Sequence, residues 1–298
     1  MLALRAMRSL WAMFVYLCAV LLGGALLAPW LYKAAQAFPN IAKDEFHFYV
    51  QNALLAMGLI CIWPLARFLG LNSLRNLGLA RPIRERKNFF YGFLFGIVSL
   101  SVAAGAAIVM GGREIRVNVS FFHLLLRLSG ILLTALGVAS LEEILFRGAV
   151  FGSLRKASNW VVALVLSSAI YGIVHFFAPA PWTGPVTWSS GLQILPAMLA
   201  GFLDLKELIP AFINLMLAGT LLGLAYQRTG TLWFSMGIHA GWVFWIKFNM
   251  KYTDSIADST FFGSNRLVNG WLATIVLVLS LLIFLRLRLG KSADIPTG

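Results

Sequence analysis

Two adjacent glutamates and an arginine interrupt an otherwise apolar stretch of the chain, in the run SLEEILFRG at positions 140–148. On a helix Glu143 and Arg147 are four residues apart, so the two side chains can pair along one face. Glu142 lies about 100° further round the same helix and can point elsewhere. A carboxylate in this position is suited to act as a general base toward water. Because two glutamates share one arginine, the cluster keeps a surplus negative charge, which favours a functional site over a purely structural ion pair.

Two histidines in other apolar runs are candidates for the same site. They are His175, in the run AIYGIVH, and His239, in the run MGIHAG. With a rise of about 1.5 Å per residue, Glu142 and His175 lie roughly 20 and 27 Å from the basic turn at Arg155, and His239 lies roughly 15 Å from the turn at Arg228. All three are therefore expected between the membrane midplane and the outer half of the bilayer. Two imidazoles and a carboxylate can activate water, and they are also a known zinc-binding set, so a divalent metal such as zinc stays open as a cofactor.

The chain that must position these groups has 298 residues, of which 60% are hydrophobic and 12% charged. Soluble domains are about 45–50% apolar and about 25% charged, so a soluble enzyme, a coiled coil and a disordered chain are excluded. A bilayer core needs about 20 apolar residues per helix. The composition predicts an all-α, polytopic transmembrane bundle of about eight spans. The apolar runs are 9–32, 46–66, 89–112, 128–152, 157–203 (broken by prolines), 208–227, 229–246 and 267–285.

The net charge of +13 is explained by membrane topology. With the N-terminus inside, the inner segments carry 14 Lys and Arg and the outer segments carry eight; Arg127 and Arg147 lie within spans and complete the 24. Inner segments are normally the more basic ones, so both termini are expected in the cytoplasm. The basic segment 81–87 is interpreted as an anchor to the bilayer surface, and no nucleic-acid partner is expected. We expect an integral protein of a bacterial inner (plasma) membrane.

The whole chain, 1–298, is predicted to form one transmembrane domain. Within it we expect N-terminal accessory helices at 1–120, a catalytic core at 130–245 and a C-terminal helix at 265–290. Segment 192–205, in the long proline-containing connection, is expected to be a re-entrant or surface helix. Glycines spaced four residues apart permit close helix packing. These pairs are Gly92/Gly96, Gly219/Gly223 and Gly237/Gly241.

The polar residues also match a family pattern. The sequence resembles the CPBP family of intramembrane proteases, which includes CAAX prenyl endopeptidases (Ras-converting enzyme) and bacteriocin-processing or immunity proteins. The resemblance covers about residues 130–245 and includes the run LLGLAYQRTGTLW at 221–233. Three motifs carry it: E-E-x-x-x-R at Glu142, Glu143 and Arg147; F-x-x-x-H, approximated by Tyr171 and His175; and the first position of H-x-x-x-N/D at His239.

The resemblance implies an endopeptidase that hydrolyses a peptide bond of a membrane-associated protein or peptide. Glu142 would activate the water with help from His175, and His239 would orient the water or polarise the carbonyl. Glu143 and Arg147 would hold Glu142 in place. The family has been described both as metalloproteases and as glutamate proteases, and the sequence leaves this open. A site in the outer half of the bilayer favours substrates exposed on the non-cytoplasmic side.

One departure from the family pattern concerns activity. Val243 stands where the family has Asn or Asp, and a valine can neither hold water nor stabilise an oxyanion. Asn214, in the preceding span, is a candidate to replace that amide, and Tyr171 for Phe adds a hydroxyl. Two alternatives therefore stay open. The chain is either a catalytically attenuated member acting as an immunity or partner-binding protein, or an ion or proton transporter whose buried cluster is a relay.

Overall fold

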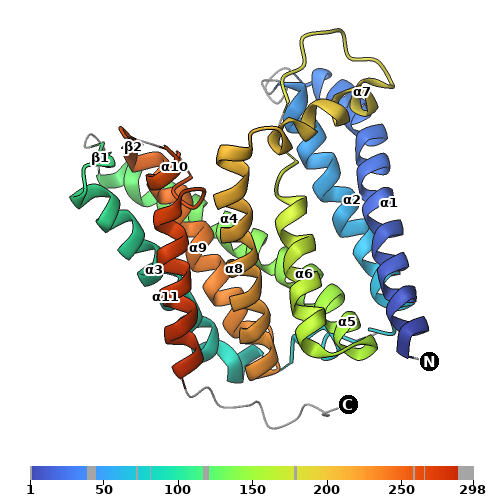
Figure 1. Ribbon diagram of the computed structural model, residues 1–298. Coiled ribbons are helices and arrows are strands. Elements are labelled where there is room, and N and C mark those ends of the chain that lie inside the picture. Colours follow the sequence, from blue (N-terminus) through green and yellow to red (C-terminus); the bar gives the residue numbers. More distant parts are fainter. Residues whose placement is uncertain are drawn as a thin grey trace. The chain divides into compact units, whose positions relative to one another are not determined.

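The computed structural model describes residues 2–38, 45–71, 73–80, 82–116, 121–177, 180–257, 259–264 and 266–287. Figure 1 shows that these residues are almost entirely helical, and the predicted all-α polytopic fold is confirmed. The elements are α1 (Leu2–Gln36), α2 (Phe46–Phe68), α3 (Pro82–Val109), β1 (Arg113–Ile115), α4 (Phe121–Glu142), the π-helix η1 (Glu143–Phe151), α5 (Gly152–Ala157), α6 (Trp160–Val174), α7 (Ser190–Met198), the 3₁₀-helix η2 (Leu199–Phe202), α8 (Leu205–Thr229), α9 (Trp233–Tyr252), β2 (Thr253–Ser255), α10 (Ser259–Phe262) and α11 (Trp271–Arg286).

Five helical segments of the described chain are long and apolar enough to cross a membrane. They are Leu10–Gln36, Phe46–Phe68, Ile83–Val109, Leu124–Lys156 and Leu205–Thr229. Helices α6 and α11 are apolar but shorter. The chain is therefore an integral membrane protein, whereas the count of eight spans and the cytoplasmic placement of the termini stay predictions.

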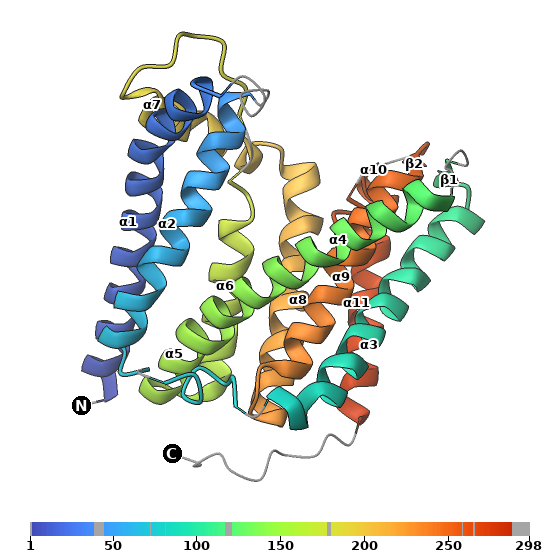
Figure 2. The same cartoon turned by 180° about the vertical axis from the view of Figure 1, so that it is seen from behind.

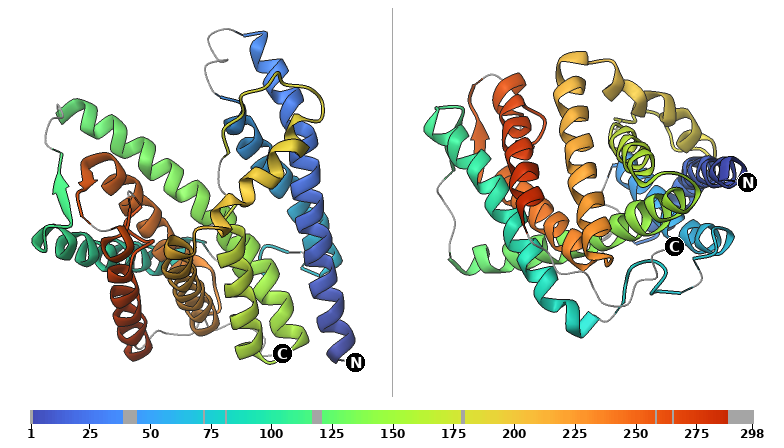
Figure 3. Two further views of the ribbon diagram at one scale, coloured as in Figure 1. Left: turned by 45° about the horizontal axis from the view of Figure 1, so that its top comes forward. Right: turned by 60° about the horizontal axis from the view of Figure 1, so that its bottom comes forward.

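The chain divides into two compact units, and the first comprises residues 1–72 and 173–204. Helices α1 and α2 pack along each other, and α7 lies against the C-terminal half of α1 (Figure 3). Gly191 of α7 permits this contact, because a Cβ there would lie 1.8 Å from the backbone oxygen of Ala25. The segment predicted to be a surface or re-entrant helix is helical, as α7 followed by η2.

The second unit comprises residues 73–172 and 205–298 and contains the other helices. In Figure 2 α4 runs obliquely along α9, and α3 packs against α9 as well. The core between α3, α8, α9 and α11 is built from large apolar side chains that solvent barely reaches. They include Leu100, Leu221, Leu222, Ile238 and Phe284.

The contact between α3 and α9 is a crossing of two glycine pairs from the predicted set. A Cβ on Gly92 would lie 2.2 Å from the oxygen of Phe234, and one on Gly96 would lie 2.3 Å from the oxygen of Ile238. The relation is mutual. Cβ atoms on Gly237 and Gly241 would lie 2.1 and 2.4 Å from backbone oxygens of α3. The two backbones therefore touch, which any side chain at these positions would prevent.

The turn between α8 and α9 is fixed by hydrogen bonds to the segment that leads into α3. The amide of Leu232 donates to the oxygen of Gly78 at 2.9 Å, and Trp233 Nε1 donates to the oxygen of Ala80 at 2.9 Å. The Thr231 hydroxyl donates to the buried carboxylate of Glu85 at 3.2 Å. The start of α9 is thus anchored. Within the predicted basic anchor, Arg84, Arg86 and Lys87 are exposed, and Arg81 lies outside the described residues.

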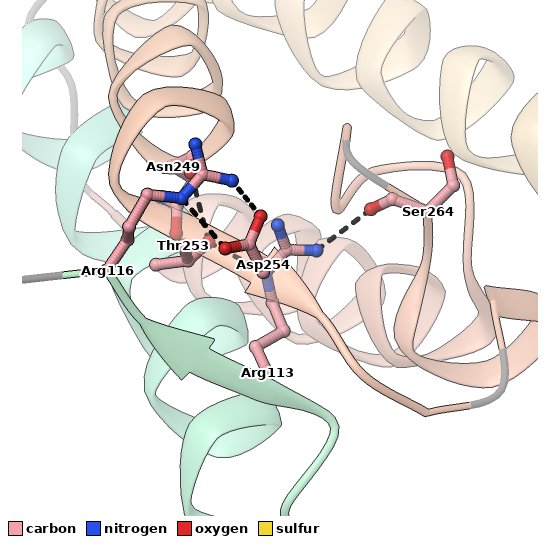
Figure 4. A network of polar contacts seen from close by, with 6 residues as sticks. All are labelled: Arg113, Arg116, Asn249, Thr253, Asp254 and Ser264. Carbon is pink, nitrogen blue, oxygen red and sulfur yellow. Dashed lines mark hydrogen bonds and ion pairs between the residues drawn. The ribbon is translucent and has the colours of Figure 1, made fainter.

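The other end of α3 is tied to α9 by the antiparallel strands β1 and β2 (Figure 4). Arg113, almost fully buried, donates from Nε to Thr253 Oγ1 at 3.0 Å and from Nη1 to the oxygen of Ser264 at 2.8 Å. Arg116 pairs with Asp254, and this hydrogen bond holds the pKa of the Asp254 carboxyl below its ordinary value. Burial lowers the pKa of the Arg113 guanidinium. Both ends of α9 are therefore bonded to segments adjoining α3.

Candidate active site

The paired glutamates lie where the α-helix α4 changes into the π-helix η1. Glu142 is the last residue of α4 and Glu143 is the first of η1. π-Helical turns are rare in proteins as a whole, but many of those that occur lie at functional sites. Arg147 Nη1 lies 2.9 Å from Glu143 Oε1, and both side chains are buried, with 3% and 0% of their surface exposed. The ion pair predicted from the spacing of four residues is therefore present.

His239, in the first half of α9, lies between the two carboxylates. Its Nδ1 is 3.0 Å from Glu143 Oε1, and its Nε2 is 3.7 Å from Glu142 Oε2. The first distance is a hydrogen bond, whereas the second exceeds hydrogen-bond length and is within the range of an ion pair. Glu142 keeps 26% of its side chain exposed, in contrast to Glu143. Glu143 is thus the anchor for Arg147 and His239, and Glu142 is the more accessible carboxylate.

Aromatic rings close the cluster on the side of α6. The Arg147 guanidinium carbon lies 4.4 Å from the centroid of the Tyr171 ring, which is a cation–π contact. The Tyr171 ring lies edge-on to His239 at 6.2 Å and to Phe146 at 5.1 Å between centroids. Phe146 was not among the predicted site residues. Its place one residue before Arg147, inside the glutamate–arginine run, is the signal that identifies it.

The sequence singled out three further residues, His175, Val243 and Asn214. His175 is a turn residue directly after α6 and belongs to the first unit, so its part in the site stays a prediction. Val243 is partly buried one turn beyond His239 on α9. Asn214 is buried in α8, where its Nδ2 donates to the oxygens of Val268 and Gly270 at 2.9 and 3.0 Å and its Oδ1 accepts from Thr274 at 2.7 Å. These bonds join α8 to α11 and account for the buried amide without a catalytic role.

Some buried polar atoms of the cluster have capacity for a further ligand. Within the described part of the chain, Glu143 Oε2 and Arg147 Nη2 make no hydrogen bond. Buried polar atoms normally have a partner, so water or substrate is expected beside them. As for a metal, the described residues contain no group of three His, Cys, Asp or Glu side chains placed to hold one.

Replacing Arg147 by alanine is expected to destabilise the protein strongly. The change leaves the carboxylate of Glu143 buried without its cation, and breaking a buried pair in this way costs about 3–5 kcal/mol. The matched control is Arg127→Ala, because Arg127 lies on the preceding helix α4 with an exposed side chain. Unfolding in detergent micelles measures both variants. Equal stability of the two variants would show that the ion pair does not hold the site.

Comparison with known proteins agrees with the motifs. The family model described as "Type II CAAX prenyl endopeptidase Rce1-like" matches residues 124–245. This range contains both glutamates, Arg147, Tyr171 and His239, and it begins after α3. No curated protein and no solved structure matches the chain. The resemblance to CPBP intramembrane proteases is therefore confirmed.

Proposed function

Residues 124–245 match the model of the Rce1-like family of type II CAAX prenyl endopeptidases. From this match we propose that the chain hydrolyses a peptide bond of a membrane-associated protein or peptide. The family match supports, at the level of the family, a CAAX-type intramembrane protease. The observation that supports a catalytic site in this chain is the position of His239, with one ring nitrogen toward each of two adjacent carboxylates.

The arrangement assigns different tasks to the two glutamates. Glu143, held by Arg147, accepts a hydrogen bond from Nδ1–H of His239, and this contact selects the tautomer with an unprotonated Nε2. Nε2 then accepts a hydrogen bond from a water that also contacts Glu142, across the gap of 3.7 Å. The pair positions the water and leaves the Glu142 carboxylate as the base.

The proposed reaction uses this geometry. Glu142 takes one proton from the water while the water oxygen bonds to the carbonyl carbon of the substrate, and the C=O electron pair moves to the carbonyl oxygen. The tetrahedral intermediate collapses, the C–N bond breaks, and Glu142 returns the proton to the leaving nitrogen. The products are a carboxylic acid and an amine, so atoms and charge balance.

The depth that the sequence predicts for the site favours one substrate class. A cluster in the outer half of the bilayer would receive segments exposed on the non-cytoplasmic side, so we propose a membrane-anchored protein or peptide of a bacterial inner membrane as the substrate in preference to a cytosolic prenylated one. The test uses the full chain in liposomes with single-span peptides that carry a quenched fluorophore pair beside the membrane. Cleavage by wild type and its loss in Glu142→Gln are the expected results, and the rate with and without a chelator decides between a metal-dependent and a metal-independent reaction. Equal rates for wild type and Glu142→Gln would overturn the proposal.

A second candidate function is that of a catalytically attenuated family member that acts by binding a partner. Val243 favours it, because valine stands where the family has Asn or Asp. Val243→Asn is expected to raise kcat about tenfold, because single oxyanion donors are worth about 10²–10³ and an amide one turn after His239 restores such a donor. Val243→Leu is the control, because leucine is close to asparagine in size but has no polar amide. If neither variant changes kcat, Val243 does not limit the reaction.

A further inference from the structure

A hydrogen bond across the α3–α9 contact lies close to His239 in the sequence. Trp242, three residues after His239, donates from Nε1 to Ser99 Oγ of α3 at 2.9 Å. Ser99 in turn donates to the backbone oxygen of Gly96 at 2.9 Å. Both side chains are buried, at 7% and 5% exposure, so water does not compete for this bond. A glycine of the crossing is thereby linked to the helix that carries the catalytic histidine.

The glycine crossing and the hydrogen bond constrain different movements. Backbone contact at Gly96 and Gly241 fixes how closely α3 and α9 approach. At the glycine crossing, a turn of α9 about its own axis is opposed by van der Waals contact alone. A hydrogen bond is directional, so the Trp242–Ser99 bond adds a specific restraint on this rotation. Because residues three apart lie on neighbouring faces of a helix, a turn of α9 that breaks the Trp242 bond also moves His239 away from Glu143.

We infer that Ser99 is a positioning residue for the reaction: its bond to Trp242 fixes the rotation of α9 and so keeps His239 between Glu142 and Glu143. This inference rests on the proposed function where it concerns the rate. Ser99 lies in α3, before the segment 124–245 that matches the family model. The start of α9 is anchored separately by Leu232 and Trp233. Loss of the Ser99 bond is therefore expected to displace the part of α9 that carries His239 without unfolding the protein.

The chain offers a matched control for the test. Ser101 lies two residues further along α3, and its hydroxyl donates to the oxygen of Ile97 in the same helix at 2.8 Å. Ser101→Ala therefore removes a serine hydroxyl from α3 without touching α9. Trp242→Phe removes the other partner of the bond. The double variant of Ser99→Ala and Trp242→Phe tests whether the two residues act through one interaction.

Two readouts separate positioning from general stability. The first is kcat and KM for peptide cleavage in liposomes, where Ser99→Ala is expected to lower kcat about tenfold with KM unchanged, because misplacing a catalytic group acts on the transition state. The second is the imidazole ¹⁵N signal of His239 in the ¹⁵N-histidine-labelled full chain in micelles, assigned through His239→Gln. We expect this signal to shift in Ser99→Ala and Trp242→Phe and to stay in place in Ser101→Ala.

The outcomes are distinct. The double variant is expected to match the worse single variant in both readouts. If the imidazole ¹⁵N signal of His239 has the same chemical shift in Ser99→Ala and in Ser101→Ala, the positioning role of Ser99 is overturned. If wild type does not cleave the peptides but the His239 signal still shifts in Ser99→Ala, the proposed protease function fails and the positioning of His239 by Ser99 stands.

Discussion

Replacing Glu142 by glutamine lowers kcat for peptide cleavage about 10³-fold and leaves the free energy of unfolding close to that of wild type. The loss in rate is expected because a glutamine amide cannot take a proton from water, and a positioned general base contributes about 10²–10⁴-fold. The stability is expected to persist because Glu142 is partly exposed and is not the carboxylate that pairs with Arg147. Cleavage in liposomes and unfolding in micelles measure the two quantities.

Glu143→Gln is the control, because it makes the same chemical change one residue further along. Glu143 is fully buried and holds both Arg147 and His239, so its loss leaves a buried cation unpaired. This variant is expected to lose activity together with about 3–5 kcal/mol of stability. The contrast between adjacent residues is the result that matters. If Glu142→Gln unfolds as readily as Glu143→Gln, or if it retains wild-type kcat, Glu142 is not the separate base proposed here.

Part of this site is visible in the sequence because its geometry is local. The spacing of four residues between Glu143 and Arg147 sets their contact on any helix-like backbone, and the structure has this contact. The run of apolar residues likewise specifies helices, since a membrane requires every backbone group to be bonded within its own segment. Even so, the spacing does not distinguish an α-helix from the π-helix η1, because both place these two side chains near one another.

The contacts of His239 could not be read from the sequence. Its two ring nitrogens reach residues about 96 positions earlier in the chain, and such a contact depends on how α9 is rotated. The same reason explains Asn214. A polar residue in an apolar run has to bond somewhere, but only the tertiary structure identifies its partners as Val268, Gly270 and Thr274.

The partner of a glycine pair also could not be read from the sequence. The contact between the glycine pairs gives the prediction with the largest structural effect. The spacing of Gly237 and Gly241 indicates a close contact without naming the partner, and the structure identifies it as the pair Gly92 and Gly96 of α3. His239 lies between the two glycines of α9 along the chain. The contact that sets the distance between the helices therefore also sets the distance from α3 at which His239 is held.

Gly237→Ala is expected to destabilise the protein by about 1–3 kcal/mol or more and to lower kcat about 10²-fold. The added Cβ would lie 2.1 Å from the oxygen of Phe89 and 2.8 Å from the amide nitrogen of Phe93. Backbone atoms cannot turn aside as a flexible side chain does, so α9 must move away from α3 and carry His239 with it. Gly105→Ala, on α3, is the control because its Cβ would meet nothing within 4 Å.

Gly105→Ala is an informative control because alanine has a higher helix propensity than glycine. With free space around it, Gly105→Ala is expected to leave stability unchanged or to raise it by up to about 1 kcal/mol. Unfolding in micelles then reports a loss of stability for Gly237→Ala and none for Gly105→Ala, and cleavage in liposomes reports a lower kcat for Gly237→Ala alone. Equal behaviour of both variants would mean that α3 and α9 do not touch through their backbones. In that case the position of His239 would have to be set by the Ser99–Trp242 bond and the anchored start of α9 alone.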